Sequence, residues 1–405
     1  MSSEVCLINP PKPYLLNPMA CPPLGLMTVA SALKDVGYDV ELIDLNKDSN
    51  IPESEIYGIS MTTADFNTCI EIRDGIKQQY GAKVIVGGPH PTLCPEECAQ
   101  YFDVVCVGDH SSILHLNGER IVYGYTKDFD RYHPDREIVD LWDYDFYVLG
   151  ERATTVVFTQ SCPWRKCAFC CRYQMPYDRV RFHSVKWCEE EIAEIAEKGF
   201  RSIQIYDDEF LTFRKRDEQI IKLLSEYGIE VWRCFLRADY CLKNRDLVEL
   251  AARNGLGEVL VGVESGSDTI LKVIDKGTTT AMVEEAFRFL HSKNVAIKAA
   301  CIVGLPSESP QTLEESWKFY ERIEPYVKDW DFTVFCPYPG SKVWNHPEAY
   351  DIRFDKEECY TAYKGMRAEG WKPPKISTST LSFEQILEAR ERFERRFKFK
   401  EEVEL

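Results

Sequence analysis

Short apolar runs alternate with helical stretches along this chain, and the alternation limits the fold more than any other feature of the sequence. In the first 110 residues, stretches 26–35 and 69–79 carry apolar residues at helical spacing and separate runs that are apolar throughout. Apolar strands that alternate with helices are typical of a parallel sheet covered on both faces. The sequence therefore predicts a doubly wound, Rossmann-like α/β domain, with strands at residues 5–9, 40–45, 57–61, 83–86 and 104–107.

A second series of β/α units follows and predicts a partial barrel. Helical stretches such as 189–198 and 281–293 separate its strands. Enzymes built on (β/α) barrels place their chemistry at the carboxyl ends of the strands. Six units describe a barrel that lacks two strands, and an open six-stranded sheet is the competing topology. The expected strands are residues 155–159, 202–206, 230–236, 259–263, 297–303 and 331–335.

The chain divides into four expected parts. Residues 126–150 are aromatic, charged and aperiodic, with Pro134 as a breaker, which is typical of a linker. Ser382 and Gln385 form a capping-box pattern that predicts a helix near the C-terminus. We expect a Rossmann-like domain in residues 1–125, the linker in 126–150, the partial barrel in 151–344 and a small helical extension in 345–405.

Charge and composition limit the kinds of molecule that this protein is expected to bind. The formal charge of −17 at pH 7 disfavours nucleic acid and anionic membrane surfaces. No apolar run reaches the roughly 18 residues that a membrane span needs, and the N-terminus lacks a signal-peptide pattern. Sixteen cysteines in a long apolar chain of this kind indicate reduced thiols rather than a disulfide scaffold. We expect a cytoplasmic protein that acts on a small molecule or a peptide.

Three cysteines stand in one short loop, in the segment CPWRKCAFCC after the first strand of the second series. Cys162, Cys167 and Cys170 offer three thiolates, which can hold three irons of a 4Fe-4S cluster and leave the fourth iron open. A zinc site is the alternative, but it needs a fourth ligand, for which His183 is the candidate. A loop without metal is the third possibility. The spacing favours the cluster.

The cysteine segment resembles the cluster loop of the radical S-adenosylmethionine (SAM) superfamily, including an aromatic residue before the last cysteine. Four residues separate the first two cysteines here, where the superfamily has three. Segments similar to the superfamily's SAM contacts follow the later strands in the expected order. The resemblance implies a 4Fe-4S cluster on Cys162, Cys167 and Cys170, and SAM contacts from Phe169, Tyr206, Asp207, Asp208, Glu209, Arg237, Glu264, Ser265, Gly304, Leu305, Pro306 and Phe335.

The segments INPP, PPLGLM, GISMTT, VIVGGPHPT and DVVCVGD together resemble the cobalamin-binding domain that precedes many radical SAM domains. Glycines at the carboxyl edge of a sheet let the backbone approach a large flat ligand such as a corrin ring. No Asp-x-His-x-x-Gly motif is present, so the resemblance implies cobalamin without a histidine on cobalt, and His90 and His110 have the pattern of turn residues. The implied cobalamin contacts are Pro22, Pro23, Leu24, Gly25, Thr62, Thr63, Gly87, Gly88, His90, Pro91, Thr92 and Gly108.

The two resemblances imply an enzyme that cleaves SAM to a 5′-deoxyadenosyl radical and methylates an unactivated carbon with the help of cobalamin. Radical cyclisation, rearrangement or oxidation without methyl transfer is the alternative, and a non-catalytic cobalamin or redox sensor is a further one. The methylthiotransferase plan needs three cysteines in the N-terminal domain, where Cys94 and Cys98 form only a pair. The expected partner is an electron donor such as flavodoxin or ferredoxin.

Overall fold

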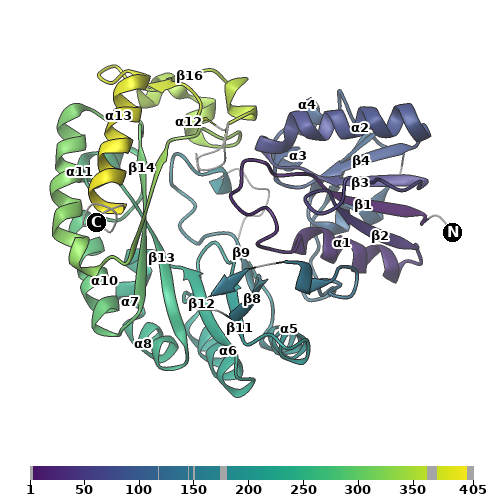
Figure 1. Cartoon of the computed structure of the whole chain (residues 1–405), viewed down its shortest axis with the longest axis horizontal. Helices are drawn as coiled ribbons and strands as arrows, with labels where there is room; N and C mark the ends of the chain where they lie inside the picture. The colour runs from purple at the N-terminus through teal and green to yellow at the C-terminus, as the bar shows by residue number, and fades with distance from the viewer. Residues whose placement is uncertain are drawn as a thin grey trace, which may run out of the picture.

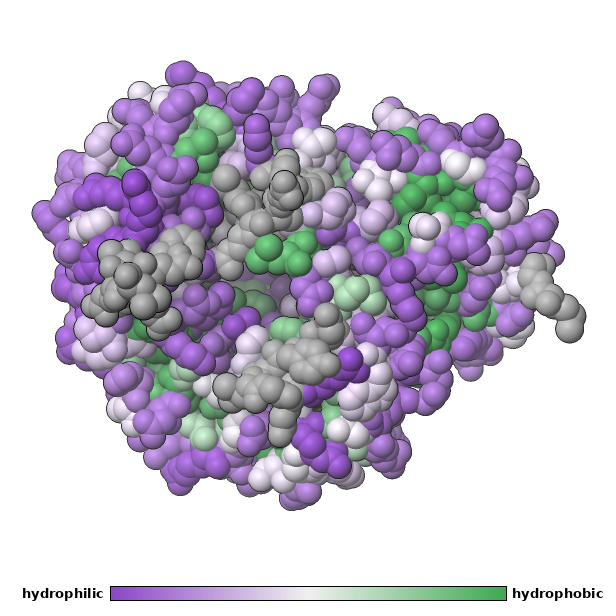
Figure 2. Space-filling view, viewed as in Figure 1, coloured by the Kyte–Doolittle hydropathy of each residue, from purple (hydrophilic) through white to green (hydrophobic). Residues whose placement is uncertain are grey.

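The computed structural model describes residues 3–116, 118–144, 146–148, 151–173, 180–362 and 372–398. Two mainly parallel sheets lie side by side, one from each half of the chain, and helices cover them (Figure 1). The first described residues, which lead into β1, lie at the far side of the first sheet, and the last described residues lie near helices of the second part (Figure 1). On the face shown in Figure 2, most of the surface is hydrophilic and apolar residues gather in patches.

The first sheet has six parallel strands in the order β2-β1-β3-β4-β5-β6. These are β1 (Val5–Asn9), β2 (Val40–Asp44), β3 (Ile56–Ser60), β4 (Lys83–Gly87), β5 (Val104–Gly108) and β6 (Ile121–Gly124). The five expected strands are present, whereas β6 is too short to stand out in the sequence. The strand order reverses between β1 and β3, and doubly wound folds bind ligands outside the carboxyl ends of the strands at such a point.

Helices cover both faces of the first sheet. They are α1 (Leu24–Asp35), α2 (Phe66–Tyr80), α3 (Pro89–Leu93) and α4 (Pro95–Cys98), with a 3₁₀ segment at His110–His115. Because side chains alternate along a strand, Val5 and Leu7 join the core on the α1 side, whereas Cys6 and Ile8 join the core on the α2 side. The predicted doubly wound arrangement is confirmed.

The second sheet contains six parallel strands from successive β/α units and one antiparallel edge strand. In sheet order they are β15 (Asp329–Val334), β14 (Ala296–Val303), β13 (Leu256–Glu264), β12 (Glu230–Phe235), β11 (Ser202–Ile205), β8 (Glu151–Val156) and β7 (Tyr147–Val148). Among the described residues, β15 and β7 do not pair with each other, so the barrel stays open. Its helices are α5 (Val185–Glu197), α6 (Arg214–Glu226), α7 (Ala238–Lys243), α8 (Arg245–Arg253), α9 (Asp268–Val273), α10 (Thr280–Ser292) and α11 (Pro310–Ile323).

One apolar core runs from the α1 face of the first sheet into the barrel. Met27 and Leu33 of α1 belong to the same buried cluster as Val156 of β8 and Ile203 of β11. Leu141, from the segment between the sheets, is buried in that cluster too. The two halves therefore share a core.

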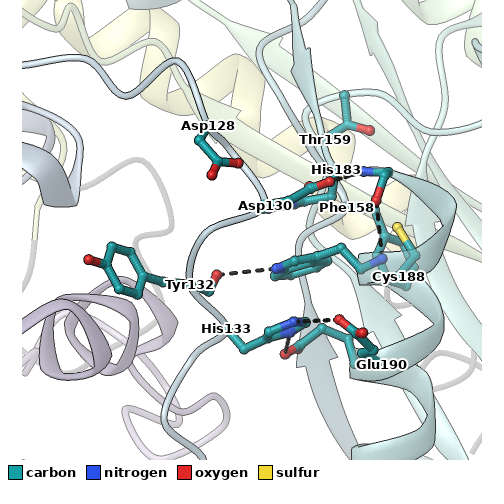
Figure 3. Close-up of polar contacts among 12 residues, drawn as sticks. Asp128, Asp130, Tyr132, His133, Phe158, Thr159, His183, Cys188 and Glu190 are labelled. Carbon is teal, nitrogen blue, oxygen red and sulfur yellow. Dashed lines mark hydrogen bonds and ion pairs between the residues drawn. The ribbon is translucent and has the colours of Figure 1, made fainter. Parts of the chain in front are cut away.

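The segment between the sheets runs along helix α5, where Figure 3 shows its polar contacts. The carboxylate of Asp130 accepts a hydrogen bond from His183 Nδ1 at 3.0 Å. The two ring nitrogens of His133 lie 2.9 Å from a carboxylate oxygen of Glu191 and 3.1 Å from one of Glu190. This segment is therefore fastened to the barrel by side chains of α5 and by His183, two residues before it.

The same segment binds α1 on its other side. Tyr132 Oη donates to the carboxylate of Asp35 at 2.9 Å, and Lys34 Nζ pairs with Asp135 at 2.6 Å. Ser31 Oγ donates to the carbonyl of His133 at 2.7 Å. Residues between the sheets thus hold both halves at once.

The C-terminal extension closes one side of the barrel and reaches back to the first sheet. It contains α12 (Lys342–Asn345), β16 (Arg353–Phe354), β17 (Ile376–Ser377) and α13 (Phe383–Phe393), followed by a π-helical turn at Glu394–Lys398. The capping box of Ser382 and Gln385 is present at the start of α13, as the sequence predicts. No helix in the described part of the chain is both long and apolar enough to cross a bilayer.

Candidate active site

The cysteine loop follows β8 and the short strand β9 (Thr159–Gln160), and neighbouring strand ends hold it in place. Ser161 N donates to the Asp208 carboxylate at 2.8 Å, and Ala168 N donates to the carbonyl of Ile274 at 2.8 Å. Trp164 Nε1 donates to the carbonyl of Asp275 at 2.8 Å. Ser161 has a φ of 79°, a conformation that costs energy for a residue with a side chain. The loop shape is therefore imposed by its surroundings.

The three predicted cluster ligands lie in this loop, Cys167 buried and Cys162 and Cys170 half-buried. Burial raises the pKa of each thiol, and for Cys167 the cations Lys276 and Arg237 oppose that rise. Arg237 Nη1 lies 4.0 Å from the Cys167 sulfur. Positive charge beside the loop favours thiolates, the form that binds metal.

The zinc alternative fits this geometry poorly. A tetrahedral zinc site brings its ligand atoms within about 4 Å of one another, because Zn–S bonds are about 2.3 Å long. Among the described residues, neither Cys162, Cys167 nor Cys170 belongs to a group of three metal-ligating atoms within 4.8 Å of one another. His183, the proposed fourth ligand, stacks on Trp187 at 3.5 Å and bonds Asp130. Wider spacing suits a multi-iron cluster.

The acidic segment after β11 uses two of its carboxylates to hold the protein together. Asp207 is fully buried and accepts hydrogen bonds from the backbone N–H groups of Phe158 and Thr159 at 2.7 and 3.0 Å. Glu209 is buried and accepts from Arg237 N at 2.7 Å. Burial raises the pKa of Asp207 to about 7 and that of Glu209 to about 8. These two side chains face neighbouring loops, so a ligand here would meet the backbone of the segment.

Tyr206 and Asp208 of the same segment lie toward the first half of the chain. Both line the cavity between the sheets. Asp208 pairs with Arg172 at 2.9 Å, directly after the cysteine loop. Tyr206 Oη lies 3.4 Å from the sulfur of Cys21, which precedes α1. The segment after β11 therefore connects the cysteine loop to the first half of the chain.

A buried ion pair lies at the carboxyl end of β13. Glu264 has a φ of 62°, and its carboxylate accepts from Lys276 Nζ at 2.7 Å. A Cβ atom at Gly262 would lie 2.3 Å from Glu264 Oε1 and 2.8 Å from Lys276 Nζ, so a side chain there would displace the pair as it stands. Burial disfavours the charge on Lys276, but Glu264 and the Cys167 thiolate raise its pKa. Sequence reasoning missed Lys276 because it follows α9 rather than a strand.

The glycine motif after β14 is held in place by Glu308, a second residue that the sequence analysis did not identify. Gly304 has a φ of 84°, and its N–H donates to Glu308 Oε2 at 2.6 Å. Glu308 is fully buried, and burial raises its pKa to about 8. Leu305, Phe335 and Ser265 are buried beside it in the barrel end. A carboxylate four residues after a glycine is the only sequence signal that pointed to Glu308.

A cavity of about 390 Å³ lies between the carboxyl edge of the first sheet and the start of the barrel. Its barrel side is formed by Thr159, Gln160 and Arg172, which flank the cysteine loop, and by Tyr206 and Asp208, which follow β11. Five of the expected cobalamin contacts line its other side. These are Gly25, Gly87, Gly88, Thr92 and Gly108.

The remaining expected cobalamin contacts do not line this cavity. Thr62 Oγ1 donates to Asp65 at 2.7 Å, and Thr63 Oγ1 lies 3.1 Å from His90 Nδ1. The His90 ring is fully buried beneath the loop after β4. Among the described residues, His110 is the only histidine that borders the cavity. Of the other expected contacts outside the cavity, Pro22 and Pro23 precede α1, Leu24 is its first residue, and Pro91 lies within α3.

The glycines at the cavity have different reasons for being glycine. At Gly88 a Cβ atom would lie 2.7 Å from the carbonyl of Met61, and at Gly108 it would lie 2.2 Å from that of Gly124. Both have positive φ, so the protein's own backbone requires glycine at these two positions whatever lies in the cavity. Gly25 also lines the cavity, but a Cβ atom there would meet nothing within 4 Å, so no protein atom accounts for the missing side chain.

Comparison with known proteins matches both halves of the chain to families. Residues 18–115 match the B12 binding domain, and residues 156–320 match the Radical SAM superfamily. An uncharacterized methyltransferase of Pyrococcus horikoshii is 27% identical over 82% of this chain and 79% of its own length. The anaerobic magnesium-protoporphyrin IX monomethyl ester cyclase of Cereibacter sphaeroides is 24% identical over 78% of this chain and 59% of its own.

Two solved structures share the fold over nearly the whole chain. The cobalamin-dependent SAM radical enzyme OxsB with aqua-cobalamin bound gives a TM-score of 0.72 at 17% identity, covering 96% of this chain and 66% of that one, slightly under two thirds. The radical SAM methyltransferase TsrM from Kitasatospora setae, with cobalamin and a [4Fe-4S] cluster bound, gives 0.66 at 16% identity, covering 88% and 81%. The likeness in fold therefore spans both halves of this chain.

Proposed function

Because this chain belongs to the radical SAM superfamily and carries a B12 binding domain ahead of the radical SAM domain, we propose that it methylates an unactivated carbon of a small molecule, using a 4Fe-4S cluster, SAM and cobalamin. One observation carries the proposal. The cavity between the sheets is bordered on one side by Gly25 and on the other by Gln160 and Arg172, which flank the cysteine loop. Cobalamin on the first sheet would therefore face the loop that we assign to the cluster.

The donor set around the cysteine loop fits a cluster. Cys162, Cys167 and Cys170 would hold three irons, and the cations Arg237 and Lys276 offset the negative charge of their thiolates. When bound, the cluster supplies one electron for the cleavage of SAM, and cobalamin supplies a methyl carrier. The hydrogen bonds from Ser161 N and Ala168 N hold the loop in place, and they would keep the three thiols positioned to bind the cluster.

The proposed SAM contacts lie at the carboxyl ends of the barrel strands, and neighbouring side chains hold several of them in position. Glu308 positions the Gly304-Leu305-Pro306 loop, because its carboxyl accepts hydrogen bonds from that backbone. Lys276 holds the carboxylate of Glu264 in place. These buried pairs keep water out of the barrel end, which protects a reactive site. The full set proposed for SAM is Phe169, Tyr206, Asp207, Asp208, Glu209, Arg237, Glu264, Ser265, Gly304, Leu305, Pro306 and Phe335.

The fit for cobalamin rests on Gly25, whose missing side chain leaves a flat edge toward the cavity. We propose that Gly87, Gly88, Thr92 and Gly108 complete that edge with backbone groups. His90 supports the proposal that no histidine binds cobalt from the loop after β4, because its ring is buried away from the cavity. The divisions after residues 125, 150 and 344 remain predictions, as does flavodoxin or ferredoxin as the electron donor.

A second candidate function is radical cyclisation or oxidation without methyl transfer, and the similarity to a cyclase favours it as the alternative. Anaerobic reconstitution followed by reaction with methyl-labelled SAM and extract metabolites separates the possibilities. Both 5′-deoxyadenosine and a labelled carbon-methyl product are expected. 5′-Deoxyadenosine without labelled product would favour the alternative. If neither product forms, the non-catalytic sensor would be favoured.

The matched control for this assay is Cys171→Ala. Cys171 follows the last predicted ligand directly, and its side chain lies near Arg172 and Asp208. The Cys167→Ala, Cys170→Ala double variant should lose all SAM cleavage, whereas Cys171→Ala should keep its iron. Equal SAM cleavage in the double variant would refute the cluster assignment.

A further inference from the structure

A second group of metal-ligating side chains lies outside the cavity, beneath the loop after β4. His90, Cys94 and Glu97 have ligand atoms that all lie within 4.8 Å of one another. They are four and then three residues apart on a nearly continuous helical stretch, in which Cys94 N donates to the carbonyl of His90 at 2.8 Å. Residues at this spacing share one helix face. None of the three lines the cavity between the sheets.

The His90 ring is prepared for a ligand at one nitrogen. Its Nδ1 lies 3.1 Å from Thr63 Oγ1, and in the tautomer protonated at Nδ1 the ring donates a hydrogen bond to that hydroxyl and has its lone pair on Nε2. The ring is fully buried, and Nε2 makes no hydrogen bond of ordinary length to any described residue. Its recorded polar neighbour is Glu97, whose carboxylate oxygen lies 3.5 Å away and whose pKa the His90 ring lowers. A buried nitrogen with only so long a contact is costly, which calls for an explanation.

Cys94 and Glu97 complete the group. Burial, together with the negative charge of Glu97 and Glu96, raises the pKa of the Cys94 thiol to about 12. Tyr360, from the C-terminal extension, lies with its hydroxyl 3.0 and 2.9 Å from the two carboxylate oxygens of Glu97. That contact fixes the carboxylate in the way that outer partners orient metal ligands.

We propose that His90, Cys94 and Glu97 bind one zinc ion, with water as the fourth ligand. A nitrogen, a sulfur and an oxygen ligand together suit zinc, which accepts all three kinds and prefers four ligands. On binding, the Cys94 thiol gives its proton to solvent, so the thiolate and the Glu97 carboxylate neutralise the two positive charges of the ion. The Nε2 lone pair of His90 takes the remaining protein position.

The ion would lock the loop after β4 to the C-terminal extension. Pro89 and Thr92, on either side of His90, line the cavity between the sheets. Tyr360 packs edge-on against the His90 ring, with ring centroids 5.5 Å apart. The zinc would therefore order one wall of that cavity from behind, without touching a ligand inside it. This inference rests on the three side chains alone and stands whether or not the proposed function is right.

The experiment measures zinc in the full chain after anaerobic reconstitution of the cluster, so that the cysteines of the cluster loop are occupied by iron. Wild type and Glu96→Gln, the matched control, should hold one zinc per chain. Cys94→Ser and Glu97→Gln should lose at least nine tenths of it while keeping the same iron content. Glu97→Gln guards against misfolding, because glutamine preserves the shape that contacts Tyr360.

A second readout is thermal. Removal of zinc by a chelator should lower the melting temperature of wild type and of Glu96→Gln but leave that of Cys94→Ser unchanged. Three results would overturn the proposal: wild type that takes up no zinc from an excess, zinc content that is equal in wild type and Cys94→Ser, or an equal effect of the chelator on both.

Discussion

Replacement of Gly25 by leucine separates the folding of this chain from its binding of cobalamin. Gly25 lies in the first turn of α1 and is exposed, and a Cβ atom there would meet nothing within 4 Å. Glycine within a helix is less favourable than alanine or leucine by up to about 1 kcal/mol. Gly25→Leu should therefore leave the unfolding free energy of the cobalamin-free chain unchanged or raise it by up to about 1 kcal/mol.

The same change should weaken cobalamin binding, because the isobutyl group would occupy the cavity edge on which we place the corrin ring. A loss of at least tenfold in affinity, about 1.4 kcal/mol, is expected, with a smaller loss for Gly25→Ala. Gly75→Leu is the matched control, since Gly75 lies exposed in α2 and its Cβ atom would also meet nothing within 4 Å. It should gain similar stability and bind cobalamin normally.

The assay pairs thermal unfolding of the cobalamin-free chain with titration of hydroxocobalamin, followed by its absorbance. Gly88→Ala should instead lower the unfolding free energy of the cobalamin-free chain, because its Cβ atom would clash with the carbonyl of Met61 at 2.7 Å. Unchanged cobalamin affinity in a well-folded Gly25→Leu chain would refute the placement of the ring at the start of α1.

Three further predictions use other parts of the structure. The Cys167→Ala, Cys170→Ala double variant should lose its iron by elemental analysis while Cys171→Ala keeps it, and iron loss in Cys171→Ala would show that the longer spacing shifts ligation. His90→Ala should leave the cobalt spectrum unchanged, because the ring does not line the cavity; a changed cobalt ligand would contradict this. Burial raises the pKa of Glu308 to about 8, so its carboxyl lowers stability progressively as the pH rises from about 4.5 to 8. Glu308→Gln should remove that slope in unfolding measured across this pH range, and an unaltered slope would show that Glu308 does not titrate in the folded chain.

The strand ends could be predicted from the sequence, whereas the partners behind them could not. Apolar runs and the residues that follow them are local patterns, so the positions of Glu264 and Gly304 were found directly. Lys276 and Glu308 belong to the same barrel end, but they reach it through the fold from loops and helix starts. No local sequence pattern indicates that these two side chains reach the barrel end.

His90 shows the same limit in the other half of the chain. Its place after a glycine-rich strand end suggests a ligand of cobalamin, yet the short helix α3 turns its ring under the loop toward Cys94 and Glu97. Likewise, Gly88 looks like a place for close approach of a ligand, but its neighbour is the backbone at Met61. In both cases the side-chain direction is set by contacts that are distant in the sequence.

The shared core has a consequence for how the chain is made. The ribosome completes the first sheet and α1 before any barrel strand exists, so Met27 and Leu33 can then pack only on the first-sheet side of the shared core, against residues such as Val5 and Leu7. Val156 and Ile203, on the barrel side of that core, are synthesised well over a hundred residues later, at about 5 to 20 residues per second. For several seconds the first half of the chain therefore lacks the barrel part of its core, and we expect it to expose apolar surface during that time.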